Sequence, residues 1–432
     1  MSSGGAGPGP GPAAERVARG PGMAAWFATR AGRRLLGLAV WATACLTAMV
    51  LGFVVSRLAP PGLSGSVFEN DFSAFWAAGR LAPEVGPLAT LDPPVVAEVQ
   101  LYAERERAQP PFFPWLYPPG WLAAMVPLGQ LSYAAAYLGF VLGSLAAFVA
   151  AAALVAPPGA PRAMRWTPVL VAAGGMLMVA QAYSGQLTLL WTALLMLSLA
   201  LVERGRPVAA GLVLGLLSVK PTLCLLLPLA FLAAGDRRFV AAAAVSVVLV
   251  AAVPTLWTGI EYWPRWVEVV GEQSARMQEN VHSIRGMLSW YAAARGAGAE
   301  HGAALALQGV VSLGAAVAVA LTWWRARLAF GARAAVLLIA IPVASPYAWY
   351  YELVLVVAGM LFLMREGWGR SIGAWVLLVI VWALGGFLPF LSNLVEFRYL
   401  MAPVTTLCLV AAVAHAWRGV EARGTAPSGA VG

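Results

Sequence analysis

The sequence predicts an all-α integral membrane protein, a polytopic bundle of about 12 transmembrane helices with two long segments on the outer face of the membrane. The chain is 61% hydrophobic and only 11% charged, whereas roughly a quarter of the residues in a soluble domain are charged. Apolar runs of about 20 residues recur from residue 35 to 417, and each is long enough to cross a bilayer. The runs are continuous and lack an alternating ten-residue pattern, which favours helices over a barrel.

The apolar runs predict the helices in chain order. They lie at roughly 35–56, 119–132, 133–156, 167–183, 186–202, 207–219, 221–234, 238–256, 303–324, 333–345, 347–364, 371–390 and 398–417. The first run is too long for the core of a signal peptide, so we interpret it as a true helix. Three runs are too short to cross alone: 119–132, 207–219 and 221–234. The last two meet at Lys220-Pro221, where proline cannot continue a helix.

The basic residues predict the orientation. If the N-terminus is cytoplasmic, 18 of the 28 basic residues fall on the cytoplasmic side, in short loops and in the two terminal tails, as the positive-inside rule requires. Residues 1–34 then form a largely disordered cytoplasmic tail, 35–418 the transmembrane domain, and 419–432 a second disordered cytoplasmic tail. Segments 57–118 and 257–302 lie outside. We therefore expect a multi-pass protein of the plasma membrane, and the net charge of +9 indicates orientation rather than nucleic-acid binding.

The second outer segment contains the stretch WPRWVEVVGEQSARMQENVHSI, which predicts an amphipathic helix. Trp263, Trp266 and Val270 share one face of it. Such a helix can lie in the headgroup region of a bilayer, or it can simply cap the bundle, and the sequence does not choose between the two.

Several motifs are missing from the chain. The three cysteines, Cys45, Cys224 and Cys408, lie singly in apolar runs and are expected to be small core residues without a disulfide or zinc. No Gly-x-x-x-x-Gly-Lys-[Ser/Thr], Asp-x-Asp, His-Glu-x-x-His or Gly-x-Ser-x-Gly occurs, which argues against an ATP-driven pump, a metal site for a nucleotide sugar, and a protease or esterase. We predict no metal and no cofactor. An enzyme on the outer face would need a donor carried in the bilayer, such as a lipid phosphate.

In the predicted orientation, the unusual polar residues gather near the outer face. They are Asp71, Tyr117-Pro118-Pro119, Ser184-Gly185-Gln186, Lys220-Pro221, Ser345-Pro346-Tyr347 with Tyr350, Tyr351 and Glu352, and Arg398-Tyr399.

Lys220 is the only lysine of the chain and lies among apolar residues. An ionisable group in such a place is expensive, which makes it a functional hypothesis. Its ammonium suits a phosphate. The alternative is a lysine that reaches to the membrane interface along its apolar stem.

Asp71 is one of only three aspartates, and it begins a helix-like run. It suits a helix N-terminus, where its oxygen caps free N–H groups and the helix dipole keeps it ionised. The same position would suit a catalytic base, because Phe75 and Ala78 lie one turn further on and would form a pocket with an aromatic wall.

The remaining candidates have equally plain alternatives. Gln186 could bind substrate or only close a turn. Tyr117, before two prolines, is a structural aromatic unless it lines a pocket. His282 is the one histidine near the outer polar cluster, and a lone histidine is more often structural.

These motifs, in this order, resemble those of the polyprenol-phosphate-mannose-dependent α-mannosyltransferases of the actinobacterial cell envelope. That group is glycosyltransferase family 87 of the GT-C superfamily, and includes the phosphatidylinositol-mannoside mannosyltransferases. The matching elements are Asp71 to Ala78, Leu91-Asp92-Pro93 without the family's tyrosine, Tyr117-Pro118-Pro119 with Val126-Pro127-Leu128, Gly185-Gln186, the run from Arg204 to Leu229 with Lys220-Pro221, and Ser345-Pro346 with Tyr351-Glu352. The resemblance covers about residues 35–418.

The resemblance implies a GT-C bundle that transfers mannose from polyprenyl-phosphate-mannose to a glycolipid or glycan acceptor on the outer face. Asp71 would be the general base of an inverting, metal-independent reaction, and Lys220 with Arg398 would bind the donor phosphate. The expected substrate-binding residues are Tyr117, Gln186, Phe75, Tyr347, Glu352 and His282.

One departure from the family pattern concerns Tyr347. Relatives commonly have a histidine directly after the late Ser-Pro pair, so Tyr347 or His282 would substitute for it. Three other readings stay open: a transporter or flippase for a lipid-linked sugar, an inactive scaffold, and a transferase of another polyprenyl-phosphate sugar such as arabinofuranose or glucose. The transporter predicts internal repeats, and no repeat is evident.

Overall fold

The computed structural model describes residues 71–103, 113–156, 169, 175–280, 284–368, 372–384 and 398–424. Within these ranges the chain is helical, and its one β-type contact is an isolated bridge between Met287 and Trp349. The all-α class predicted from the sequence is confirmed for this part of the chain.

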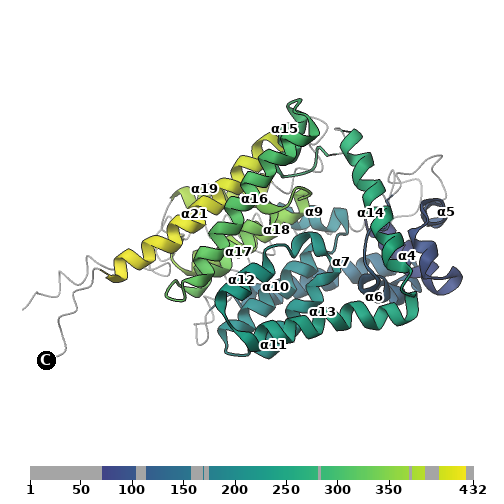
Figure 1. Cartoon of the computed structure of the whole chain (residues 1–432), viewed down its shortest axis with the longest axis horizontal. Coiled ribbons are helices and arrows are strands. Elements are labelled where there is room, and N and C mark those ends of the chain that lie inside the picture. The colour runs from purple at the N-terminus through teal and green to yellow at the C-terminus, as the bar shows by residue number, and fades with distance from the viewer. Residues whose placement is uncertain are drawn as a thin grey trace, which may run out of the picture.

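The helices follow one another in the order shown in Figure 1. The first half holds α4 (Phe72–Val85), η1 (Pro87–Leu91), α5 (Pro93–Ala103), α6 (Pro119–Gly129), α7 (Tyr133–Ala153), α9 (Met176–Ser184), α10 (Thr188–Glu203), α11 (Pro207–Gly215), η2 (Leu216–Val219), η3 (Pro221–Leu223) and α12 (Leu227–Ala234). The second half holds α13 (Arg237–Thr258), α14 (Tyr262–Glu279), α15 (Trp290–Gly296), α16 (His301–Trp324), α17 (Phe330–Ala344), η4 (Tyr350–Glu352), α18 (Leu353–Arg365), α19 (Ile372–Val379), η6 (Ile380–Leu384) and α21 (Arg398–Gly424).

Four helices in the described ranges are long and apolar enough to cross a membrane: α7, α13, α16 and the Tyr399–Arg418 part of α21. A fifth crossing results if α9 and α10, which are bent by 119° at a short break, count as one span. These helices support a helical membrane protein. The total of about 12 crossings stays a prediction, and the expected first helix at 35–56 and the tail at 1–34 lie outside the described residues.

The break expected at Lys220-Pro221 is confirmed. Helix α11 ends at Gly215 and gives way to two short 3-10 turns, η2 and η3, which meet at Lys220. Pro221 has no N–H for a helical hydrogen bond, and its ring disfavours a helical conformation in the residue before it. Lys220 accordingly has φ −125° and ψ 76°, so its side chain leaves the chain at a bend and not from a regular helix.

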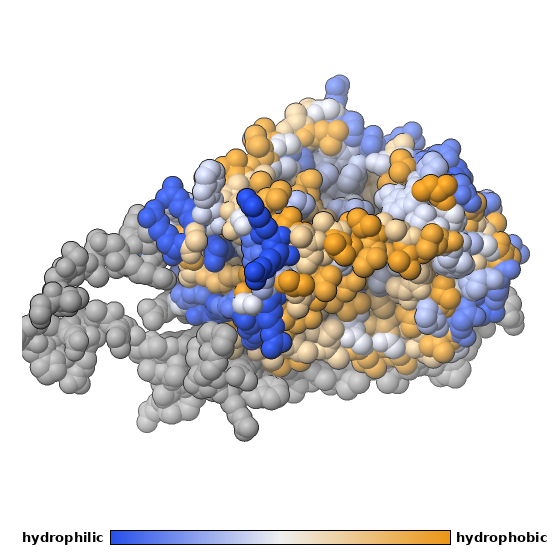
Figure 2. All heavy atoms as spheres, turned by 60° about the horizontal axis from the view of Figure 1, so that its bottom comes forward, coloured by the Kyte–Doolittle hydropathy of each residue, from blue (hydrophilic) through white to orange (hydrophobic). Residues whose placement is uncertain are grey.

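The outward surface of several helices is apolar. In Figure 2 an orange band runs over the face formed by α11 and α13, with hydrophilic residues on either side of it. Only 11% of the apolar window of α13 is buried. Large exposed side chains on these two helices include Val208, Leu212, Val245, Val248, Leu249, Val253 and Leu256. A contiguous apolar face of this kind is expected where lipid replaces water.

The amphipathic helix expected in the second outer segment is α14, and it packs against the first outer segment. The hydroxyl oxygen of its buried Tyr262 accepts a hydrogen bond from the Trp115 indole at 2.8 Å. Val269 is also buried, whereas Trp263, Trp266 and Val270 are half-buried. The buried face is therefore centred on Tyr262 and Val269, because the helix is rotated to bring Tyr262 to Trp115. This packing favours the capping role over a role confined to lipid headgroups.

Helix α4, which begins directly after Asp71, crosses α6 at two glycines. A Cβ atom on Gly79 would lie 2.2 Å from the carbonyl oxygen of Met125, and one on Gly129 would lie 2.2 Å from the amide nitrogen of Arg80. Contacts this short leave no room for any side chain, so the two backbones approach as closely as in small-residue helix pairs of membranes. Figure 1 shows α4, α5, α6 and α14 gathered at one end of the molecule.

An aromatic cluster fills the space next to this crossing. The ring of Phe75, which is 1% exposed, meets those of Trp115, Tyr117, Trp121 and Phe140 at centroid distances of 5.1 to 6.1 Å, all edge to face. Edge-to-face pairs add to the burial of apolar area. The cluster fixes the position of Tyr117 relative to the first turn of α4.

We expect Gly79→Ala to destabilise the protein by about 1–3 kcal/mol, because the added methyl overpacks a backbone–backbone contact. The matched control is Gly139→Ala in α7, where nothing lies within 4 Å of the added Cβ and helix propensity favours alanine by roughly 0.5–1 kcal/mol. Thermal unfolding of the detergent-purified variants measures both. Equal unfolding midpoints for the two would contradict the close crossing of α4 and α6.

Candidate active site

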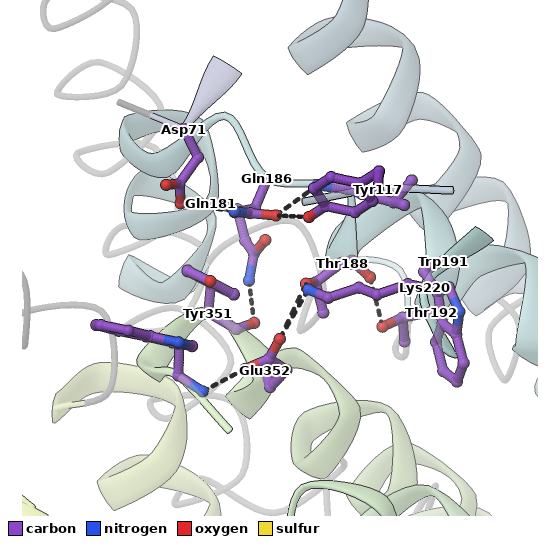
Figure 3. Close-up of polar contacts among 12 residues, drawn as sticks. Asp71, Tyr117, Gln181, Gln186, Thr188, Trp191, Thr192, Lys220, Tyr351 and Glu352 are labelled. Carbon is purple, nitrogen blue, oxygen red and sulfur yellow. Dashed lines mark hydrogen bonds and ion pairs between the residues drawn. The ribbon is translucent and has the colours of Figure 1, made fainter. Parts of the chain in front are cut away.

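Two hydrogen-bonded groups of polar side chains lie side by side in the structure (Figure 3). Asp71, Gln186 and Tyr117 form the first, here the Asp71 group. Lys220, Glu352 and Thr188 form the second, here the Lys220 group. Residues from five separate regions of the sequence thus meet, and the break between α9 and α10 contributes to both groups.

The break between α9 and α10 depends on one glycine. Gly185 ends α9 with φ 60° and ψ 27°, a left-handed conformation that glycine adopts without a steric penalty. The chain then turns by 119° into α10. As a result Gln186 and Thr188, two residues apart, face different partners: Gln186 belongs to the Asp71 group and Thr188 to the Lys220 group.

The carboxylate of Asp71 is bound by Gln186 and does not cap its helix. Gln186 Nε2 donates to Asp71 Oδ2 at 2.6 Å, and the side chain makes no capping hydrogen bond. Asp71 has φ −60° and ψ −20°, whereas capping by a side chain needs an extended backbone at this position. The expectation of a side-chain cap is therefore wrong, although Asp71 does stand at the N-cap position.

The same glutamine binds Tyr117. The Tyr117 hydroxyl donates to Gln186 Oε1 at 3.0 Å, and the backbone N–H of Leu187 donates to the same oxygen at 3.3 Å. Because its oxygen is held on one side, the amide of Gln186 has to present its nitrogen to Asp71. Tyr117 itself packs against Phe75, so Phe75 takes its place in the site as the support beneath Tyr117.

The surroundings of Asp71 raise its pKa. Asp71 lies outside the helices long enough to span a membrane, and it keeps part of its surface exposed, but its carboxyl group is surrounded by protein. Loss of hydration raises the pKa to about 6; the Gln186 hydrogen bond and the positive charge of Lys220 lower it, and the negative charge of Glu352 raises it. A carboxylate with a pKa near 6 is ionised at neutral pH and is a stronger base than an ordinary aspartate.

Lys220 is buried and ion-paired. Its Nζ donates to Glu352 Oε1 and to Thr188 Oγ1, both at 2.8 Å, and lies 5.0 Å from the centre of the Tyr351 ring. The residue is 8% exposed. An ammonium that reached to the membrane interface would be hydrated, so the snorkelling alternative is wrong for this structure.

Glu352 is held from the other side by the turn that carries it. Its Oε2 accepts a hydrogen bond from the Trp349 backbone. The turn is bound in its place by the end of the second outer segment, where Leu288 N donates to Ala348 O at 2.7 Å and Tyr350 N donates to Gly286 O at 2.9 Å. The outer segment thereby determines where the partner of Lys220 stands.

A comparison with models of known protein families identifies the family of the chain. The family model described as glycosyltransferase family 87 matches residues 115–346, more than half of the chain. The chain belongs to glycosyltransferase family 87. It is accordingly a membrane glycosyltransferase. No curated protein and no solved structure matches the chain.

The matched range includes Tyr117, Gln186 and Lys220, whereas Asp71 and Glu352 lie on either side of it. The structure brings these five predicted residues of the family 87 protein together, and Phe75 directly beside them. Their roles in transfer stay predictions.

Of the other three predicted residues, Tyr347 is not part of the two groups. The hydroxyl of Tyr347 bonds to Ser274 of α14 at 2.8 Å, and its ring packs near Tyr291. Tyr347 therefore packs against the segment 257–302 and not against the Asp71 or Lys220 group. His282 lies outside the described residues. Arg398 begins α21, but its side chain is not described. In the described part of the chain no three His, Cys, Asp or Glu residues gather as they would around a metal ion.

Sequence reasoning missed two residues of the site, Gln181 and Thr188, and assigned no role to Tyr351. Gln181, from α9, is 3% exposed, and its Nε2 donates to the Tyr351 backbone carbonyl. A polar residue inside an apolar helix is a usable signal, and it would have singled out Gln181. Thr188 gives no such signal, because threonine is common in membrane helices and bonds there to its own backbone.

We expect Lys220→Met to lower the stability by about 3–5 kcal/mol, because it leaves the buried Glu352 carboxylate without its cation. The double variant Lys220→Met, Glu352→Gln removes both charges and should recover much of that loss. As a control, Arg265→Met breaks an exposed pair with Glu268 of similar length, 2.7 Å, and should change the stability by no more than about 1 kcal/mol. Denaturant unfolding in detergent measures all three, and an unchanged midpoint for Lys220→Met would contradict the buried pair.

Proposed function

We propose that this family 87 enzyme moves a mannosyl residue from polyprenyl-phosphate-mannose to a glycolipid or glycan acceptor on the outer face of the plasma membrane. The observation that carries the proposal is the juxtaposition of a carboxylate of raised pKa with a buried lysine, linked through the break that holds Gln186 and Thr188. A base and a cation at neighbouring positions are what a sugar transfer from a phosphate needs.

Asp71 would act as the general base. The acceptor hydroxyl attacks the anomeric carbon, its proton passes to the carboxylate, and the bond from that carbon to the phosphate oxygen breaks. Gln186 holds Oδ2, so among the described residues Oδ1 is the oxygen left to receive the proton. One carboxylate is sufficient, because an inverting reaction forms no glycosyl-enzyme intermediate. The phosphate leaves with the bonding electrons and needs no general acid.

Lys220 would stabilise the charge on the departing phosphate. In the structure its ammonium is shared by Glu352 and Thr188, so a phosphate oxygen would compete with Glu352 for it. Hydrogen bonds from an ammonium to a phosphate are charge-assisted and gain strength where water is excluded. The pair with Glu352 keeps the lysine in place while no donor is bound.

Support for a lipid-linked donor comes from the apolar faces of the bundle and from the family resemblance of the motifs. The same geometry would suit another polyprenyl-phosphate sugar, such as arabinofuranose or glucose, because neither group contains a feature that selects mannose. A transporter of a lipid-linked sugar is the other alternative. It would bind the donor lipid without forming a new glycosidic bond.

We expect Asp71→Asn to reduce transfer by about 10²–10⁴-fold, because an amide cannot accept the proton. Membranes containing each variant are supplied with radiolabelled polyprenyl-phosphate-mannose and acceptor lipids, and labelled glycolipid is separated by chromatography. Asp92→Asn is the matched control: Asp92 is exposed in the same outer segment and should leave transfer unchanged.

Three outcomes of this assay would count against the proposal. Transfer retained by Asp71→Asn would remove Asp71 from the role of base. Transfer by wild type from the arabinofuranosyl or glucosyl lipid, but not the mannosyl lipid, would replace the donor. Movement of the lipid-linked sugar from one leaflet of a vesicle membrane to the other, with no glycosidic product, would favour the transporter.

We expect kcat/KM to depend on the ionisation of Asp71. With a pKa of about 6, the carboxylate is charged above that pH, so kcat/KM should be level near pH 8 and fall about tenfold per unit well below pH 6. Gln186→Leu removes a hydrogen bond that lowers the pKa, and should move the inflection to higher pH. A flat profile from pH 5 to 8, or an inflection that Gln186→Leu does not move, would contradict this assignment.

A further inference from the structure

Gln181 carries a buried oxygen with no protein partner. The residue is 3% exposed, and its Oε1 makes no hydrogen bond within the described part of the chain. Buried carbonyl oxygens of side-chain amides almost always have a donor, and an exception calls for an explanation such as a ligand. Ser73 Oγ and Trp121 Nε1, near Asp71 and Tyr117, also lack a partner, but Gln181 is the only side-chain amide of the described residues with such an atom.

The orientation of the Gln181 amide is determined by its other end. Its Nε2 donates to the backbone carbonyl of Tyr351. A carbonyl oxygen can only accept, so a flipped amide would set two acceptors against each other. The nitrogen must therefore face Tyr351, and Oε1 must point away from it.

Figure 3 shows where that oxygen points. The Gln181 amide lies between the Gln186 amide and the Tyr351 backbone, with its oxygen on the side of Gln186. The Gln181 amide thus lies between Asp71, the proposed base, and Glu352, which pairs with Lys220. In an inverting transfer the acceptor oxygen attacks the anomeric carbon from the side of the base, and the phosphate leaves from the opposite side, so the moving sugar lies between the base and the leaving phosphate.

We propose that Gln181 Oε1 accepts a hydrogen bond from a ring hydroxyl of the transferred sugar and so makes the site selective for it. This inference rests on the function proposed above and deepens it by naming a sugar subsite. A sugar hydroxyl can donate a hydrogen bond to Oε1. That bond would satisfy the Gln181 amide, whose nitrogen already has a protein partner and whose oxygen has none. A polar site of this type discriminates strongly against a sugar that lacks the hydroxyl, because the oxygen is then buried without a partner.

The experiment measures binding, so that it does not depend on turnover. Detergent-purified wild type is titrated with polyprenyl phosphate and with polyprenyl-phosphate-mannose, and affinity is followed by thermal shift. We expect the mannosylated lipid to bind more tightly than the bare lipid. Gln181→Leu should weaken binding of the mannosylated lipid about tenfold, the size of one to two lost hydrogen bonds, and leave binding of the bare lipid unchanged.

A series of monodeoxymannosyl lipids separates contact with the sugar from a structural effect. One deoxy position should weaken binding to wild type about tenfold and have no further effect on Gln181→Leu. A merely structural role for Gln181, through Tyr351, would weaken the binding of every lipid alike, the bare one included.

Gln308→Leu in α16 is the matched control. Gln308 is 2% exposed, and its amide is bonded throughout: Oε1 accepts from Tyr291 N at 3.2 Å, and Nε2 donates to Ser312 Oγ at 3.1 Å and Val343 O at 3.0 Å. Both variants remove a buried glutamine, but only Gln181 has the unpartnered oxygen. Gln308→Leu should lower the unfolding temperature and keep the preference for the mannosylated lipid.

The possible failures are distinguishable. If Gln181→Leu keeps the full preference for the mannosylated lipid, the subsite is wrong while the proposed function stands, and an ordered water then explains the oxygen. If it loses affinity for both lipids equally, Gln181 is structural and the subsite is again wrong. If wild type binds neither lipid, the proposed function fails and the subsite fails with it.

Discussion

The site depends on one buried charge, the ammonium of Lys220. A charge removed from water is tolerated only with a partner close by, and here the partner, Glu352, comes from 132 residues further along the chain. To bring the two within 2.8 Å, the chain must break at Lys220, turn at Gly185 so that Thr188 meets the ammonium, and hold the Tyr350–Glu352 turn against it. Each of these local irregularities serves the same ion pair.

The two helices that flank this pair are tied at both ends. At one end Thr188, which begins α10, and Glu352, which directly precedes α18, share the Lys220 ammonium. At the other end the last residues of the same helices, Glu203 and Arg365, form a second ion pair with an Nη1–Oε2 distance of 2.8 Å. Arg365 also donates to the Val155 carbonyl just beyond α7. One buried pair and one partly buried pair, a helix length apart, hold α10 and α18 in register. A rigid frame of this kind keeps catalytic groups at constant separation.

Gln186 attaches the Asp71 group to this frame. Among the described residues, its amide makes the one hydrogen bond to the Asp71 carboxylate. Its other support is packing: the α4–α6 crossing at Gly79 and Gly129, and the aromatic rings around Phe75. The base thus stands at the start of α4, and the cation is held between the starts of α10 and α18. The outer segments serve both, since residues 286–288 also hold the turn of Glu352.

The sequence by itself determined the class of the protein and the places where its helices break. The hydropathy of a segment, and the helix breaks at Gly185 and Pro221, are determined by residues that are adjacent in the chain. Such local properties can be read directly from a sequence. The motifs from Tyr117 to Ser345 likewise indicated the family that the comparison identified. The sequence also singled out Asp71, Gln186, Lys220 and Glu352, because polar residues in an apolar chain are conspicuous, and the structure brings these four side chains close together.

Only the tertiary structure decided what each of these residues contacts. It turned Asp71 away from its helix terminus to Gln186, paired Lys220 with Glu352, and moved Tyr347 to Ser274. It also showed that Gln181 has a nitrogen with a partner and an oxygen without one. Pairings across more than a hundred residues follow from how helices cross and rotate, and that rotation is determined by packing against all neighbours at once, which no local pattern of residues contains.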